Sequence, residues 1–227
     1  MRKSVIAGLM AAILLAASCC NDRCETGYEV PAPEDVMMYQ VNPRVFAPEK
    51  SFNAVAQHLD SIKALGTNVV WFMPIYPVGQ IKTVNSPYCI SDYKGVNPEF
   101  GTLEEFKNVV SLCHEKGMSV IVDWVANHTS WDNKWIESNP EWYTHEDGQI
   151  VPPIKDWADV ADLNFDNPEM RLAMIDAMKF WVTEVGIDGF RCDAADFVPF
   201  DFWKQCCDSL RAIPDHKLLL LAEGKRK

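Results

Sequence analysis

Residues 120–128 read Val-Ile-Val-Asp-Trp-Val-Ala-Asn-His, an unbroken apolar run that turns polar within a few residues. Short continuous apolar runs of this kind are typical of strands that are buried on both faces of a parallel sheet. The pattern recurs along the chain and predicts five strands, at Val36–Val41, Asn68–Pro74, Met118–Trp124, Ile187–Cys192 and Leu218–Ala222.

Amphipathic patterns between these runs predict helices, at Ser51–Leu65, from Thr102 to a stop at Gly117, from Pro168 to a stop at Gly186, and at Pro199–Ala212. Alternating strands and helices with short returns form right-handed βαβ units, which build either a doubly wound sheet or a barrel. No GxGxxG or GxxxxGK[ST] turn is present, which favours the barrel. The sequence therefore predicts an α/β fold, a (β/α)₈ TIM barrel that is incomplete, with about five of its eight strands.

The composition argues against a nucleic-acid partner. The 227 residues carry a formal charge of −11, which repels a phosphate backbone.

A hydrophobic content of 48% is enough for the core of one large domain or two small ones. The eight cysteines lack the spacing of a disulfide scaffold or a zinc site.

The amino-terminal residues are similar to a bacterial secretory signal, with basic residues, a short apolar run and small residues before Cys19. We expect export and a lipidated Cys19 that attaches the protein to a membrane, as a periplasmic or cell-surface lipoprotein, with cleavage and secretion as the alternative. The expected parts are a signal at 1–18, a tether at 19–33 and a partial barrel at 34–227 that includes an excursion at 129–167.

Polar residues end several predicted strands, at the edge where barrel enzymes carry their chemistry. Arg191 and Asp193 are two residues apart, so their side chains point to the same side of the strand. A guanidinium lowers the pKa of a neighbouring carboxylate and keeps it ionised, as a nucleophile requires. Glu223 ends the next strand, and among apolar barrel residues a glutamate can donate a proton near neutral pH. The two carboxyl groups, Asp193 and Glu223, predict retaining glycoside hydrolysis. The alternative is that Arg191 and Asp193 form an ion pair that only stabilises the fold.

Several runs resemble the α-amylase family (glycoside hydrolase family 13), in that family's order and spacing. They are Asp123-Trp124-Val125-Ala126-Asn127-His128, Gly189-Phe190-Arg191-Cys192-Asp193 with Val198-Pro199 after it, Ala222-Glu223-Gly224, and the loop runs at 86–93 and 96–102. Together these runs are strong evidence, because unrelated chains would not place them in this order after successive strands. The resemblance extends over roughly residues 36–224.

The resemblance implies individual roles: Asp193 as nucleophile, Glu223 as acid/base, Arg191 as partner of the nucleophile, His128 as a sugar contact and Tyr88 as a stacking platform. Asp123 is expected to be architectural, and it is grouped with Arg191, His128 and Tyr88 as the substrate-binding set. No cofactor is required for this chemistry. Asn127 and Asp162 match positions that hold a structural calcium in many family members, and both offer oxygen ligands. The excursion, with Trp131, Trp135, Trp142 and Tyr143, is expected to shape the substrate cleft.

By the same resemblance the partner is an α-glucan, either a starch-like polysaccharide or a maltooligosaccharide. Where many α-amylases carry Lys-His, this chain has Asp196-Phe197, which favours an enzyme that acts on oligosaccharides. The alternatives are a transglycosylase or isomerase of the same family and a non-catalytic, glycan-binding surface lipoprotein. The family's third essential carboxylate has no counterpart before Lys227, so we expect a truncated amino-terminal part of such an enzyme, poorly stable and prone to aggregate.

Overall fold

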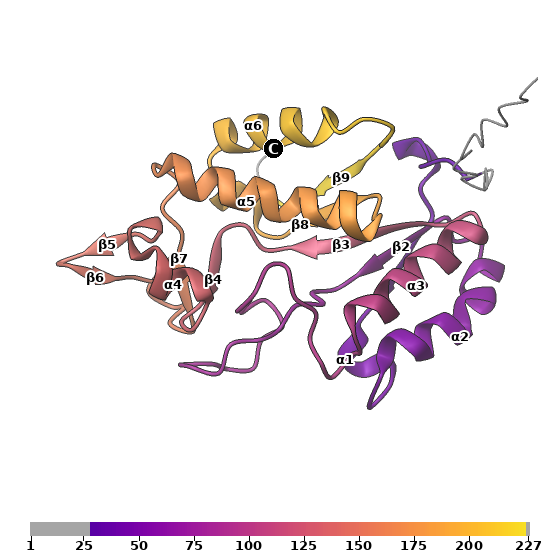
Figure 1. Cartoon of the computed structure of the whole chain (residues 1–227), viewed down its shortest axis with the longest axis horizontal. Helices are drawn as coiled ribbons and strands as arrows, with labels where there is room; N and C mark the ends of the chain where they lie inside the picture. Colours follow the sequence, from indigo (N-terminus) through magenta and orange to yellow (C-terminus); the bar gives the residue numbers. More distant parts are fainter. Residues whose placement is uncertain (1–27, 226–227) are drawn as a thin grey trace, which may run out of the picture.

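A five-stranded parallel sheet forms the centre of the computed structural model, which describes residues 28–225 (Figure 1). The strands lie in the order β1 (Met38–Val41), β2 (Val69–Phe72), β3 (Ser119–Trp124), β8 (Gly189–Cys192) and β9 (Leu219–Ala222). All five predicted strands are confirmed, and each begins one or two residues later than predicted. The predicted signal, Cys19 and most of the tether lie outside the described residues.

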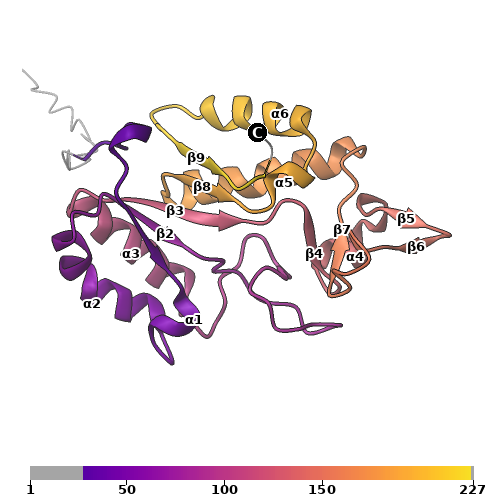
Figure 2. The ribbon, with the colours of Figure 1, turned by 180° about the vertical axis from the view of Figure 1, so that it is seen from behind.

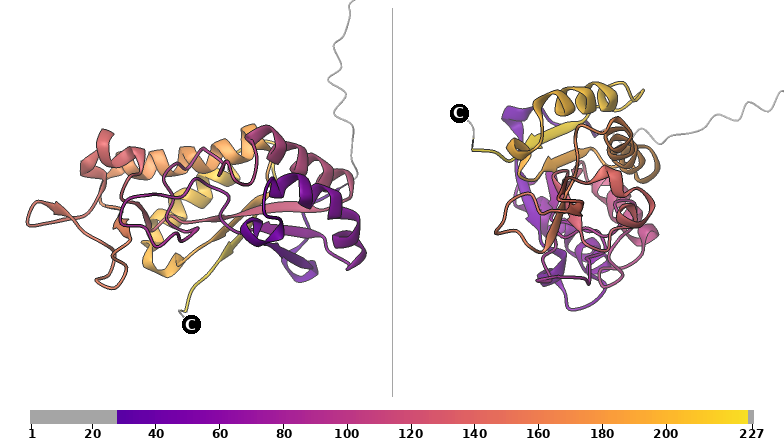
Figure 3. Two further views of the ribbon diagram at one scale, coloured as in Figure 1. Left: turned by 90° about the horizontal axis from the view of Figure 1, so that it is seen from below. Right: turned by 90° about the vertical axis from the view of Figure 1, so that its left-hand side faces the viewer.

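Helices return the chain from each strand to the next, and they lie along one side of the sheet (Figures 1 and 3). They are α2 (Ser51–Ala64), α3 (Leu103–Glu115), α5 (Pro168–Phe180), which continues into a π-helical turn at Trp181–Val185, and α6 (Phe200–Arg211). Shorter helical segments are η1 (Pro33–Asp35), α1 (Pro43–Phe46) and η4 (Ala195–Phe197). Parallel strands with helical returns on one side are the repeating unit of a (β/α)₈ barrel, so the described residues form an incomplete barrel.

Local signals in the sequence set the helix ends. Thr102 caps α3 by accepting a hydrogen bond from the Glu105 amide (3.2 Å), and the Glu105 carboxylate accepts one from the Thr102 amide (2.7 Å). Together the two bonds form a capping box, which satisfies two amides that a helix start leaves unpaired. The π-helical turn ends at Gly186, whose φ of 82° suits a glycine.

The segment between β3 and α5 leaves the barrel at the carboxyl end of β3 and extends away from it (Figure 1). It contains β4 (His128–Ser130), α4 (Lys134–Ser138), η2 (Pro140–Trp142), β5 (His145–Glu146), β6 (Gln149–Ile150) and β7 (Val160–Asp162). Strands β4 and β7 pair antiparallel, which returns the chain to the barrel beside its starting point.

Buried aromatic side chains hold the loops at this end of the sheet. The hydroxyl of Tyr93 donates to the carbonyls of Val125 (2.8 Å) and His128 (3.0 Å), and the Trp181 indole donates to the Tyr93 carbonyl (2.7 Å). These bonds fix the backbone directly after β3, where the polar residues begin. The cysteines in the described part of the chain are all free.

The opposite end of the sheet receives the described part of the predicted tether (Figure 2). Tyr28 stacks on His114 with ring centroids 4.2 Å apart and donates a hydrogen bond to the buried Asp188. Val30 is buried, and its carbonyl accepts from Lys217 at 2.9 Å. The chain therefore enters the barrel on the end away from the polar residues of β3 and β8. None of the helices between residues 28 and 225 is both long and apolar enough to span a bilayer.

Gly189 provides a test of this packing, because it allows β8 and β9 to approach closely. Its φ is 150°, and a Cβ at this position would lie 1.8 Å from the carbonyl oxygen of Leu219. We expect Gly189→Ala to lower the free energy of unfolding by about 2–4 kcal/mol in urea denaturation, from backbone strain and overpacking together.

Gly66→Ala is the matched control, because Gly66 has a φ of 87° and no atom within 4 Å of an added Cβ. Strain alone should then cost about 1 kcal/mol. Equal losses in the two variants would contradict the assigned close approach of β8 and β9.

Candidate active site

The guanidinium of Arg191 on β8 contacts three carboxylates. Its Nη1 lies 2.9 Å from Oδ1 of Asp123 and 2.8 Å from Oδ1 of Asp193, and its Nη2 lies 2.8 Å from Oε1 of Glu223. Asp123 is on β3, and Glu223 directly follows β9. Three neighbouring strands thus bring their acidic residues to one cation.

The register of the sheet explains this convergence. Asp123 lies opposite Arg191, and Arg191 lies opposite Leu221, two residues before Glu223. Backbone hydrogen bonds continue past the strands, from Asp193 to the Trp124 carbonyl (2.8 Å) and from Glu223 to the Cys192 carbonyl (2.9 Å). The side chains of Arg191 and Asp193 fall on the same side, as their two-residue spacing predicts.

Asp123 lies beneath the site and is completely buried. Burial raises the pKa of Asp123 to about 7, and the charge of Arg191 opposes that rise. A carboxylate with no exposed surface holds Arg191 in place and does not reach a bound molecule. Complete burial agrees with the architectural role expected for Asp123 and argues against its inclusion among the substrate-binding residues.

Asp193 sits at the boundary between the core and the surface, with its side chain 17% exposed. Burial raises the pKa of Asp193 to about 6, Arg191 acts in the opposite direction, and the charge of Glu223 adds to the rise. The prediction that Arg191 gives Asp193 a lowered pKa is therefore wrong. The guanidinium is present as predicted, but the loss of solvent outweighs its charge.

Glu223 does not meet the condition of apolar surroundings under which we expected it to donate a proton near neutral pH. Its side chain is 54% exposed, so the described residues do not enclose it in apolar groups. Besides Arg191, it accepts a hydrogen bond from the Ala194 amide at 3.1 Å. The residue after Asp193 therefore fixes the orientation of the Glu223 carboxylate.

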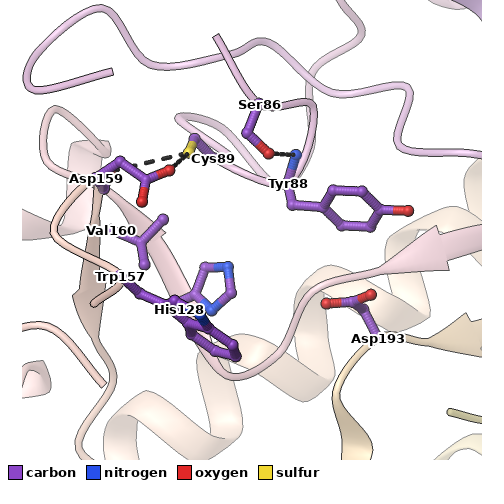
Figure 4. A pocket seen from close by; sticks show the side chains of 8 residues that line it. All are labelled: Ser86, Tyr88, Cys89, His128, Trp157, Asp159, Val160 and Asp193. Atoms are coloured by element: carbon purple, nitrogen blue, oxygen red, sulfur yellow. Dashed lines mark hydrogen bonds between the residues drawn. The ribbon is translucent and has the colours of Figure 1, made fainter. Parts of the chain in front are cut away.

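Tyr88, His128 and Asp193 line one pocket of about 200 Å³, together with Ser86, Cys89, Trp157, Asp159 and Val160 (Figure 4). Burial and the charge of Asp123 raise the pKa of Tyr88 to about 12, so its hydroxyl stays protonated. Burial lowers the pKa of His128 to about 4, so the imidazole is neutral and can exchange hydrogen bonds with hydroxyl groups. Glu223 lines a neighbouring pocket, and Trp157 lies between the two pockets and lines both.

The excursion lines part of the pocket beside Asp193, as expected, but it does so without Trp131, Trp135, Trp142 or Tyr143. Trp135 packs on Tyr93 (4.9 Å between ring centroids) and on Trp142 (5.2 Å), and Tyr143 is buried. The excursion contributes Trp157 to the pocket, a residue that the sequence analysis did not select. Its ring contacts His128 edge-on at 5.7 Å between centroids.

Asn127 and Asp162, the candidate calcium ligands, line a second pocket of about 250 Å³. Asp162 pairs with His128 across β4 and β7, which brings it beside Asn127, and Asn164 and Asp166 line the same pocket. Burial raises the pKa of Asp162. Across residues 28–225, no three His, Cys, Asp or Glu side chains gather closely enough to hold a metal ion by themselves.

The sequence also resembles known proteins over most of its length. It is 32% identical over 224 residues to Alpha-amylase 3 of Dictyoglomus thermophilum, covering 83% of this chain and 44% of the relative. It is 30% identical over 202 residues to the human amino acid transporter heavy chain SLC3A1, covering 71% of this chain and 29% of the relative. The chain thus spans less than half the length of these relatives.

Solved structures show the same likeness in three dimensions. The crystal structure of an alpha-amylase from Lactobacillus plantarum superposes with a TM-score of 0.79 at 40% sequence identity, over 84% of this chain and 45% of that one. The family described as Alpha amylase, catalytic domain, matches residues 50–158 and 141–219. Arg191 and its three carboxylates lie within or beside these matches, and the chain belongs to the alpha-amylase family.

Proposed function

We propose that this chain forms part of a retaining glycosidase that hydrolyses α-glucosidic bonds in maltooligosaccharides or starch-like polysaccharides. The observation that carries the proposal is the placement of Asp193 and Glu223 on the two terminal nitrogens of one guanidinium. Such sharing favours the short carboxyl separation of retaining enzymes, about 5 Å, over the roughly 6.5–9.5 Å of inverting ones.

In the proposed reaction Asp193 attacks the anomeric carbon as the bond to the leaving oxygen breaks, and Glu223 gives that oxygen its proton. Glu223 then takes a proton from water, which attacks the same carbon and releases Asp193. Arg191 keeps the Asp193 carboxylate oriented, and the half-buried Tyr88 offers its ring as a platform for the sugar. The Asp196-Phe197 pair supports oligosaccharides over polysaccharides as substrates.

Substitution of the two carboxylates tests the proposal. In a version of the protein extended to the full length of its relatives, we expect Asp193→Asn and Glu223→Gln each to lower the turnover of maltooligosaccharides by about 10²–10⁴-fold or more, because each removes the group that forms a bond or transfers a proton. Released reducing ends, measured over time, report the turnover.

Asp156→Asn is the control, because Asp156 is exposed and lies outside the pocket. Undiminished turnover after either catalytic substitution would remove that residue from its role. Binding of maltooligosaccharide without turnover would favour the glycan-binding alternative, and longer products would favour a transglycosylase.

The acid limb of the pH profile should follow Asp193. Because its pKa is raised to about 6 and the nucleophile acts in the ionised form, kcat/KM should fall about tenfold per pH unit below that value. Rates measured from pH 4 to 8 check this expectation, and a rate that stays constant from pH 7 to pH 5 would contradict it.

We also propose a structural calcium ion held by Asn127 and Asp162. Their pocket has oxygen donors on Asn164 and Asp166 as well, which suits a hard cation. At about 100 times the dissociation constant, calcium should stabilise the fold by about 2.7 kcal/mol and raise Tm by roughly 5–10 °C relative to chelator. Asp162→Asn should abolish the shift, whereas equal Tm values with calcium and with chelator would argue against the site.

Finally, we propose that the protein is exported and anchored through a lipidated Cys19. The sequence before Cys19 supports this, and the described chain enters the barrel on the end away from the pocket, which would leave the pocket accessible. Mass spectrometry of the mature amino terminus should find an acylated Cys19, and an unmodified amino terminus at another residue would refute the anchor.

A further inference from the structure

The pocket beside Asp193 is bounded on its far side by Cys89 and Asp159 (Figure 4). Cys89 follows Tyr88 in the loop after β2, and Asp159 precedes β7 in the excursion. The Cys89 thiol donates a hydrogen bond to Oδ2 of Asp159 at 3.1 Å. Two segments that are distant in the sequence thus meet where the pocket ends.

Further hydrogen bonds make this wall rigid. The Ile90 carbonyl accepts from the Ser130 amide and from the Asn133 side chain, both at 3.0 Å. The Trp131 indole donates to the Ala158 carbonyl at 3.0 Å, next to Asp159. The bonds to Ile90 therefore join the loop after β2 to the excursion beside the Cys89–Asp159 contact, and the Trp131 bond holds the excursion together next to Asp159, so a ligand cannot easily part the two segments.

The size of the pocket suits one sugar ring. Its volume of about 200 Å³ is smaller than the roughly 300–1,000 Å³ of pockets that enclose drug-sized ligands. A ring whose anomeric carbon faces Asp193 directs its opposite side, which bears the C4 hydroxyl, toward the Cys89–Asp159 wall.

The chemistry of the wall suits a hydroxyl donor. Burial and the hydrogen bond to Asp159 raise the pKa of the Cys89 thiol to about 12, so it remains a protonated donor that orients the carboxylate. An ionised carboxylate only accepts hydrogen bonds. A terminal sugar offers it O–H donors, whereas a ring that continues into another sugar places an ether oxygen there, which has no proton to donate.

We propose that Asp159 is a specificity residue that recognises the hydroxyl groups of the non-reducing terminal ring, so that the pocket accepts chain ends. The inference rests on the proposed function, in which Asp193 attacks the ring held in this pocket. It makes the enzyme exo-acting, and Cys89 positions the Asp159 carboxylate through the thiol hydrogen bond.

Titration of the 227-residue chain with two trisaccharides tests the inference. One is maltotriose, and the other is maltotriose with an ethylidene group across the 4- and 6-hydroxyls of its non-reducing ring. We expect calorimetry to show at least tenfold tighter binding of the unblocked sugar, because loss of hydrogen bonds to a charged group costs about ten- to one hundredfold in affinity.

Variants of Asp159 and Cys89 show whether Asp159 recognises the sugar hydroxyls or only supports the wall of the pocket. Asp159→Asn should weaken the binding of maltotriose about ten- to one hundredfold and leave the blocked sugar unchanged. Cys89→Ser keeps a donor to Asp159 and should keep the preference for the unblocked sugar. Asp156→Asn, three residues away and exposed, is the matched control and should behave as the unaltered chain.

Each remaining outcome overturns the inference in a recognisable way. Equal binding of the two sugars by the unaltered chain would show that the cleft continues past the wall. Equal weakening of both sugars by Asp159→Asn would show that Asp159 only supports the wall. If neither sugar binds to the unaltered chain, the proposed function itself fails, and the inference fails with it. Should Asp159→Asn not fold, the comparison of the two sugars on the unaltered chain still decides whether the pocket accepts chain ends.

Discussion

The ion cluster around Arg191 is the interaction on which the site depends. One guanidinium on β8 holds Asp123 from β3, Asp193 after its own strand and Glu223 after β9, each at 2.8–2.9 Å. Removing one partner of a buried ion pair leaves the other charge without compensation, which typically costs about 3–5 kcal/mol. The register of the three strands brings these groups together, and the contacts with Arg191 then hold the two proposed catalytic groups in position.

The three carboxyl groups in this cluster differ in how deeply they are buried. Asp123 has no exposed surface, Asp193 is 17% exposed and Glu223 is 54% exposed. Since all three contact the same guanidinium, their distance from solvent distinguishes them. Asp123 is buried and can only support Arg191, Asp193 faces a pocket in a fixed orientation, and Glu223 is accessible to solvent.

The sequence predicts the frame of the molecule well and the walls of its pocket poorly. The five strands, the Thr102 capping box and the same-side placement of Arg191 and Asp193 follow from local patterns with a period of two or of one helical turn. The raised pKa of Asp193 could not be predicted, because it depends on how many atoms cover the carboxylate in the folded chain. Asp159 gains its place through a contact with Cys89, 70 residues away, that no local pattern encodes. Composition likewise could not distinguish Trp157, which faces the pocket, from Trp135, which fills the excursion.

The most direct test of the account is to trap the covalent intermediate. A 5-fluoro α-glucosyl fluoride forms a glycosyl-enzyme readily and releases it slowly, because the ring fluorine disfavours the positive charge that develops in both steps. After incubation and peptide mapping by mass spectrometry, we expect one added fluoroglucosyl group on Asp193, and none in Asp193→Asn. A label on another carboxylate, or turnover of the reagent without any labelled peptide, would contradict the role of Asp193 as the nucleophile.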